Sequence, residues 1–148
     1  MRFLGTWIWA VLLLAGAVSC VRPSVEERFI PAAQAENGLY IFPVDFSDSL
    51  AAGYDLTLYT RSDAVRFSPS APIPVGICWY APDSMLVLRE RVFLPVGGVR
   101  GWTGPYRSGV RPDPAGLWRL TLRPEPGAEP IRGIGLAVRR KTNGYGTR

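Results

Sequence analysis

The sequence predicts an all-β protein whose folded part is an antiparallel β-sandwich of about seven short strands. From residue 38 onward, apolar and polar side chains alternate in short runs rich in β-branched and aromatic residues. Because successive side chains of a strand point to opposite faces of a sheet, this alternation indicates strands with one buried face. The 16 glycines and 14 prolines are too frequent for long helices but suit the turns between such runs.

The first 19 residues are predicted to be a cleaved signal peptide rather than part of the fold. Arg2 is the only charged residue before Arg22, and an apolar core between them ends in small residues. This order is typical of a secretory signal, although an uncleaved membrane-spanning helix, which needs about 20 apolar residues, is the alternative. A cysteine directly after Ala17-Val18-Ser19 resembles the lipobox of bacterial lipoproteins, in which the thiol is acylated and the signal is cut before the cysteine. We therefore expect Cys20 to carry lipid that holds the chain to a membrane.

Residues 20–37 are expected to form a flexible tether that separates the membrane from the folded domain, residues 38–148. Pro23, Pro31 and the acidic pair Glu26-Glu27 leave no sustained apolar period in this stretch. Within it, Phe29-Ile30 is a candidate first edge strand.

Six runs in the domain have the pattern of strands, at residues 39–42, 54–61, 74–80, 85–94, 117–123 and 131–140. Residues 47–52 are the one expected helical turn. Glu90 falls on the buried face of the fourth run, where it needs an arginine partner, unless a bulge turns it outward. The other side chains predicted to face the core are Leu56, Leu58, Val75, Ile77, Trp79, Leu86, Leu88, Val92, Leu94, Trp118, Leu120, Leu122, Ile134, Leu136 and Val138.

The composition argues against catalytic and metal sites. The chain has no histidine, which removes Ser-His-Asp and Cys-His arrangements and histidine-based zinc sites. Asp45, Asp48 and Asp55 lack the spacing of a dedicated calcium loop, and the other carboxylates fall mostly in turns or on polar strand faces. Cys78 is the only cysteine besides Cys20, so we expect no disulfide and a small buried apolar side chain at Cys78. The sequence thus predicts no enzyme and no metal or cofactor apart from the covalent lipid.

The basic residues are arginines except for Lys141, and they are spread through nearly every segment. The chain has 17 Lys+Arg against 12 Asp+Glu, and loss of Arg2 with the signal leaves 16 against 12. For an exported protein with dispersed charge, no nucleic-acid partner is expected. Attraction to anionic lipid or acidic glycan is allowed by the charge but is not indicated by its distribution along the chain.

Trp102, Tyr106 and Arg107 are the candidate binding residues. They lie among glycines in residues 101–109, a stretch expected to be a loop rather than a core strand. Aromatic side chains on sandwich loops can stack on sugar rings or anchor a protein partner. In the alternative interpretation, Trp102 folds back and caps one end of the sandwich.

Four segments together resemble the gliding-motility lipoprotein H family of bacterial envelope lipoproteins. They are Tyr54–Arg61, Gly101–Gly104, Gly116–Leu120 and Ile131–Leu136, which stand where that family has three strands and a Gly-x-Trp-x-Gly loop. The resemblance implies a non-enzymatic accessory subunit of a gliding or secretion machine, with a protein partner in the envelope. The expected location is the cell envelope, at the outer membrane, on either its periplasmic or its outer face. A surface glycan-binding or adhesive module is the alternative function.

Overall fold

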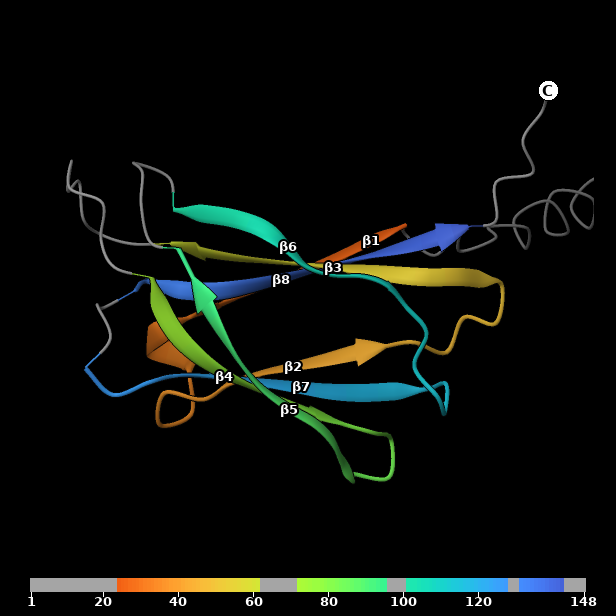
Figure 1. The fold of residues 1–148 in the computed structure, drawn as a ribbon, viewed down its shortest axis with the longest axis horizontal. Coiled ribbons are helices and arrows are strands. Elements are labelled where there is room, and N and C mark those ends of the chain that lie inside the picture. The colour runs from red at the N-terminus through yellow and green to blue at the C-terminus, as the bar shows by residue number, and fades with distance from the viewer. Residues whose placement is uncertain (1–23, 62–71, 96–100, 128–130, 143–148) are drawn as a thin grey trace, which may run out of the picture.

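Eight strands among the described residues form two antiparallel sheets that lie face to face (Figure 1). The computed structural model describes residues 24–61, 72–95, 101–127 and 131–142. The first sheet contains, in spatial order, β1 (Val25–Pro31), β8 (Gly133–Thr142), β3 (Ala51–Arg61) and β6 (Trp102–Val110). The second contains β2 (Tyr40–Asp45), β7 (Leu117–Pro124), β4 (Ile73–Tyr80) and β5 (Leu86–Leu94). The predicted antiparallel β-sandwich is confirmed, with eight described strands where about seven were expected.

The core lies between the sheets and is made of the side chains that alternate along their inward faces. Burial of one leucine or isoleucine side chain contributes about 1.5–3 kcal/mol, so this layer supplies most of the stabilisation of the fold. The predicted inward faces of β3, β4, β7 and β8 are confirmed, because every member is buried: Leu56, Leu58, Val75, Ile77, Trp79, Trp118, Leu120, Leu122, Ile134, Leu136 and Val138.

The N-terminal part of the described chain differs from the expected tether over residues 20–37. Residues 25–31 form β1, which pairs with β8 in antiparallel register from Val25↔Arg139 to Pro31↔Gly133 and is followed by the short 3-10 helix η1 (Ala32–Gln34). As an edge strand it pairs on one side only, so acidic residues such as Glu26 can stay exposed and weaken the apolar period. The signal and Cys20 lie outside the described residues. Within the described residues, no helix is long and apolar enough to cross a membrane.

Two further predictions around β2 are wrong. The strand does not stop at Pro43 but continues to Asp45, with Pro43 exposed. This is possible because β2 is an edge strand, where a proline does not remove a ladder hydrogen bond from the sheet interior. Residues 47–52 form no helical turn. Instead Asp48 accepts a hydrogen bond from the Leu50 N–H at 2.9 Å, and β3 already begins at Ala51.

Cys78 is half-buried rather than buried, and its thiol is free. Along β4 the buried residues Ile77 and Trp79 face the core, which places Cys78 on the outer face of the second sheet. The prediction failed because an apolar neighbour on either side of a strand residue says nothing about the face that the residue itself occupies.

Candidate functional site

The edge strands β5 and β6 lie on the same open side of the sandwich, and each carries a β-bulge. In β5 the register steps from Trp79↔Leu88 to Tyr80↔Leu86, so Val87 is the extra residue. Leu86 therefore shares the outer face with Tyr80 and is 44% exposed, which corrects its predicted inward orientation. Bulges are frequent at sheet edges, where they re-aim side chains.

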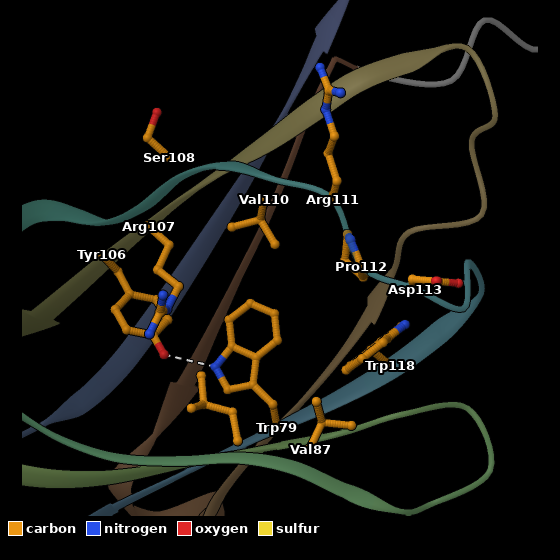
Figure 2. A pocket seen from close by; sticks show the side chains of 11 residues that line it. Trp79, Val87, Tyr106, Arg107, Ser108, Val110, Arg111, Pro112, Asp113 and Trp118 are labelled. Atoms are coloured by element: carbon orange, nitrogen blue, oxygen red, sulfur yellow. Dashed lines mark hydrogen bonds between the residues drawn. The ribbon is translucent and has the colours of Figure 1, made fainter.

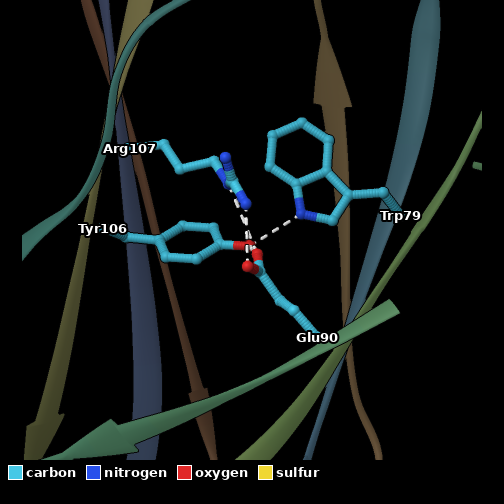
Figure 3. A network of polar contacts seen from close by, with 4 residues as sticks. All are labelled: Trp79, Glu90, Tyr106 and Arg107. Atoms are coloured by element: carbon cyan, nitrogen blue, oxygen red, sulfur yellow. Dashed lines mark hydrogen bonds and ion pairs between the residues drawn. The ribbon is translucent and has the colours of Figure 1, made fainter. Parts of the chain in front are cut away.

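Residues 101–109, expected as a loop, instead mostly form β6. Its register with β3 steps from Leu56↔Arg107 to Thr57↔Pro105, so Tyr106 is an extra residue in this strand. Without the bulge, Tyr106 and Arg107 would point to opposite faces of the sheet. With it, both side chains reach into the space between the sheets (Figure 3).

Tyr106 and Arg107 meet Glu90 of β5 there, and the core-facing side chain of Trp79 on β4 joins them (Figure 3). Arg107 donates from Nη2 to Glu90 Oε2 at 2.7 Å and from Nε to Oε1 at 3.3 Å. The Tyr106 hydroxyl donates to Glu90 Oε1 and accepts from Trp79 Nε1 at 2.8 Å. We call these four residues the bridging network, because they join the two edge strands by side chains where no backbone ladder runs. Glu90 thus faces inward with an arginine partner, one of the two orientations considered from the sequence.

The two titratable side chains that β6 contributes to the bridging network, Tyr106 and Arg107, each stay in one protonation state. Burial, and then the hydrogen bond to Glu90, raise the pKa of Tyr106 far above its usual value. The hydrogen bond to Glu90 is also the main cause that raises the pKa of Arg107. The phenol therefore stays neutral and the guanidinium charged at any physiological pH, so these two side chains form a fixed structural link between the strands.

Beyond the bridging network the edge strands diverge and leave an open cleft of about 560 Å³ between the sheets (Figure 2). Trp79 and Trp118 lie at its floor, Val87 and Leu88 on the β5 side, and the other lining residues come from β6 and the segment after it. We call this space the inter-sheet cleft. Its remaining lining residues are Tyr106, Arg107, Ser108, Val110, Arg111, Pro112 and Asp113.

The floor of the inter-sheet cleft offers rings and no free N–H groups. Trp79 Nε1 is bound to Tyr106, and Trp118 Nε1 donates to the Pro114 carbonyl at 2.8 Å. The polar lining comes from β6 and the segment after it, where Arg111 donates from Nε to the Ala52 carbonyl at 2.6 Å. An apolar floor with a few polar groups on one wall suits the insertion of an apolar or aromatic group.

Trp102, the third candidate binding residue, lies apart from the inter-sheet cleft at the start of β6, where it pairs with Thr60. Its ring covers Gly104, since a Cβ atom there would lie 2.1 Å from Trp102 Cζ2, and it packs against the core. This position agrees with the interpretation in which Trp102 caps the core. The structure thus brings Tyr106 and Arg107 together and separates Trp102 from them.

Sequence reasoning missed the floor and the polar wall of the inter-sheet cleft. Trp79 and Trp118 were predicted as core residues, which they are, at 5% and 3% exposed, but their edges also face the cleft. Arg111 and Asp113 lie beside prolines, where no alternating pattern assigns a side chain to a face. The one usable signal was Glu90, a carboxylate within an apolar strand pattern.

Of the described residues that line the inter-sheet cleft, Asp113 alone carries a carboxylate. Glycoside hydrolysis uses two carboxyl groups across the scissile bond, and such a pair is not gathered there. Nor do the described residues contain a group of three or more Cys, Asp or Glu side chains that could hold a metal ion. No protein-family model, curated protein or solved structure matches the chain significantly.

Proposed function

We propose that this chain is a lipid-anchored protein of the bacterial cell envelope that acts by binding another protein, as an accessory subunit of a gliding or secretion-type machine. The inter-sheet cleft carries the proposal. Its ring-lined floor and its arginine-bearing wall combine the residue types that dominate the energetics of protein–protein contacts.

Exposed apolar side chains at and just before the start of β5 favour a protein partner over a small ligand. Met85, Leu86 and Val87 are 64%, 44% and 59% exposed, and Val87 forms part of the cleft wall. Three consecutive exposed apolar residues beside an apolar cleft are typical of a surface that another protein covers. The bridging network supports this role because it fixes the width of the cleft before a partner arrives, which lowers the ordering cost of binding.

The resemblance to the gliding-motility lipoprotein H family supports the choice of machine. Its four segments overlap β3, the start of β6, the start of β7 and the first half of β8. They belong to both sheets, so the resemblance is not confined to one local motif.

Photo-crosslinking in intact cells tests the partner. A benzophenone amino acid at position 87 is expected to give one discrete adduct with an envelope protein, and the same probe at Val25 gives none. Val25 is a matched control, since it is an exposed apolar residue on β1, at the opposite edge of its sheet from β6. Equal adducts from both positions, or none from position 87, would refute a partner at the inter-sheet cleft.

Fractionation tests the anchor separately. The wild-type chain is expected in the membrane fraction, and Cys20→Ala is expected to lose lipid labelling and signal cleavage before residue 20. If Cys20→Ala is processed and lipid-labelled as the wild type is, the proposed lipidation site is wrong. Protease treatment of whole cells then tells an outward-facing domain, which is cut, from a periplasmic one, which is protected.

A further inference from the structure

A second concave surface lies on the outer face of the second sheet, away from the inter-sheet cleft. It is a groove of about 520 Å³ that runs over β4, which we call the arginine groove. Its floor is low because Gly76 has no side chain and Cys78 has a small one. Its walls stand on the two strands that flank β4, with Arg89 on β5 and Arg119, Thr121 and Arg123 on β7; Leu39, Ile41 and Tyr80 complete the lining.

The strand registers explain why the arginines gather here although they are dispersed in the sequence. Cys78 pairs with Arg89 on one side and with Thr121 on the other, while Gly76 and Tyr80 pair with Arg123 and Arg119. Paired residues share a face, so all three arginines stand on the outer face around the same recess. Arg119 and Arg123 are four residues apart on one strand, which separates their Cα atoms by about 13 Å. Positive charge therefore extends along the groove rather than sitting at one point.

These charges are not neutralised by described residues. No carboxylate lines the arginine groove, and no described carboxylate forms an ion pair with Arg89, Arg119 or Arg123. On the same face Arg91 forms an ion pair with Glu125 at 2.5 Å, so its charge is already neutralised and Arg91 is not counted among the ligand-binding arginines. Arg119 lies over the Tyr80 ring, 4.7 Å from its centroid, which holds one guanidinium plane in place before a ligand binds.

We propose that the arginine groove binds a linear anionic polysaccharide that carries carboxylate or sulfate groups along its chain. Arginine forms two parallel hydrogen bonds with such planar or multi-oxygen anions. β4 is an inner strand whose backbone is already paired on both sides, so a ligand over it is recognised by side chains and not by strand addition. A recess admits a single chain, whereas a flat bilayer would meet protruding basic residues instead. This binding is independent of the protein partner proposed for the inter-sheet cleft.

Dextran, carboxymethyl-dextran and dextran sulfate test the proposal because they share one backbone and differ in charge. The full-length protein, held in phosphatidylcholine nanodiscs, is titrated with each polymer at low and at physiological salt. Binding is expected for at least one charged polymer and not for dextran, and the preferred polymer tells carboxylate from sulfate. Binding is expected to weaken as salt rises.

Two groove variants and one control assign the site. The triple variant Arg89→Gln, Arg119→Gln, Arg123→Gln is expected to bind about tenfold more weakly or worse, because three surface ion pairs are removed together. Gly76→Leu keeps every charge but fills the floor, where a Cβ atom would have 3.8 Å to its nearest neighbour, and is also expected to block binding. The control triple variant Arg28→Gln, Arg61→Gln, Arg139→Gln removes the same charge from exposed positions of the first sheet and is expected to bind as the wild type does.

Each alternative outcome overturns the proposal. Equal weakening by both triple variants would mean diffuse attraction to net positive charge. Poly-glutamate or phosphatidylglycerol vesicles could also compete with the charged dextrans. If either binds as tightly as the dextrans and loses binding in the groove triple variant, the groove belongs to an acidic protein or to lipid, respectively. Absence of binding to both charged dextrans would leave the groove without its proposed ligand. If the groove triple variant does not fold, Gly76→Leu and Arg89→Gln alone decide the outcome.

Discussion

Replacement of Tyr106 by phenylalanine removes one hydroxyl group from the bridging network and leaves the ring in place. The hydroxyl accepts from Trp79 Nε1 at 2.8 Å and donates to Glu90. A neutral hydrogen bond contributes about 0.5–1.5 kcal/mol and one to a charged group about 1.5–3 kcal/mol. Because the Glu90 side chain is 23% exposed, the second value belongs at the low end of its range. We therefore expect Tyr106→Phe to lower the free energy of unfolding by about 2–3 kcal/mol.

Urea unfolding followed by tryptophan fluorescence measures this loss. Tyr80→Phe is the matched control, since the Tyr80 hydroxyl makes no hydrogen bond with a described residue, and its effect is expected to stay below about 0.5 kcal/mol. A loss for Tyr106→Phe as small as that of the control would mean that water replaces the hydroxyl at no cost. The bridging network would then not hold the two edge strands together.

Alkaline pH gives the same variant a second readout. The pKa of Tyr106 is raised above its usual 10.0 in the folded protein, so the neutral phenol stabilises the fold fully below pH 10. That contribution is lost as the pH rises toward the folded-state pKa. Tyr106→Phe is expected to lose less stability above pH 10 than the wild type. If the unfolding free energies of the two proteins fall equally with pH, ionisation of Tyr106 is not the cause of the loss.

Three other changes have defined outcomes. Asp55→Asn is expected to flatten the acid denaturation profile between about pH 4 and pH 2. Hydrogen bonds, first that from Ser108, lower the pKa of the Asp55 carboxyl from 3.8 to about 2, and the stabilisation by the ionised carboxylate is lost as the pH falls. Circular dichroism at graded pH measures the profile, and a profile equal to that of the wild type would contradict this expectation. Gly135→Ala is expected to lower the unfolding free energy by about 1–3 kcal/mol, since the new Cβ atom would lie 1.9 Å from Tyr59 Cζ and the buried ring must shift; a neutral result in urea unfolding would show that the ring moves freely. Ile77→Ala, at a fully buried position, is expected to cost about 2–5 kcal/mol in the same assay, and a cost below about 1 kcal/mol would place Ile77 outside the core.

The sequence predicts the sandwich and most of its core because alternation is a local property. In β4 every second residue is buried, and in β3, β7 and β8 the apolar residues that face the core also follow one another at a spacing of two. The edge strands are harder to recognise. β1 carries exposed acidic residues, and β6 carries glycines and a proline that an edge position tolerates but that are typical of loops.

The candidate site could not be predicted in the same way because it depends on pairing between strands. The extra residues Val87 and Tyr106 are extra only relative to their partner strands, and no feature of β5 or β6 alone shows a bulge. The position of Glu90 on a buried strand face indicates that it has a polar partner, but it does not identify which arginine that partner is. The arginine groove has the same origin, since Arg89 and Arg119 are 30 positions apart and meet only through the registers of β4.

The antiparallel pairing of β1 with β8 has a mechanical consequence for a protein anchored through Cys20. Tension from the anchor would enter the sandwich at Ser24, whose carbonyl accepts a hydrogen bond from the Arg140 N–H at 2.9 Å. A pull along the axis of β1 loads the whole ladder from Val25↔Arg139 to Pro31↔Gly133 in shear, so its hydrogen bonds resist together. A pull across the strand would break them one after another and at lower force. With such an anchor, the first sheet would resist force best along its strands and would yield most easily to force across them.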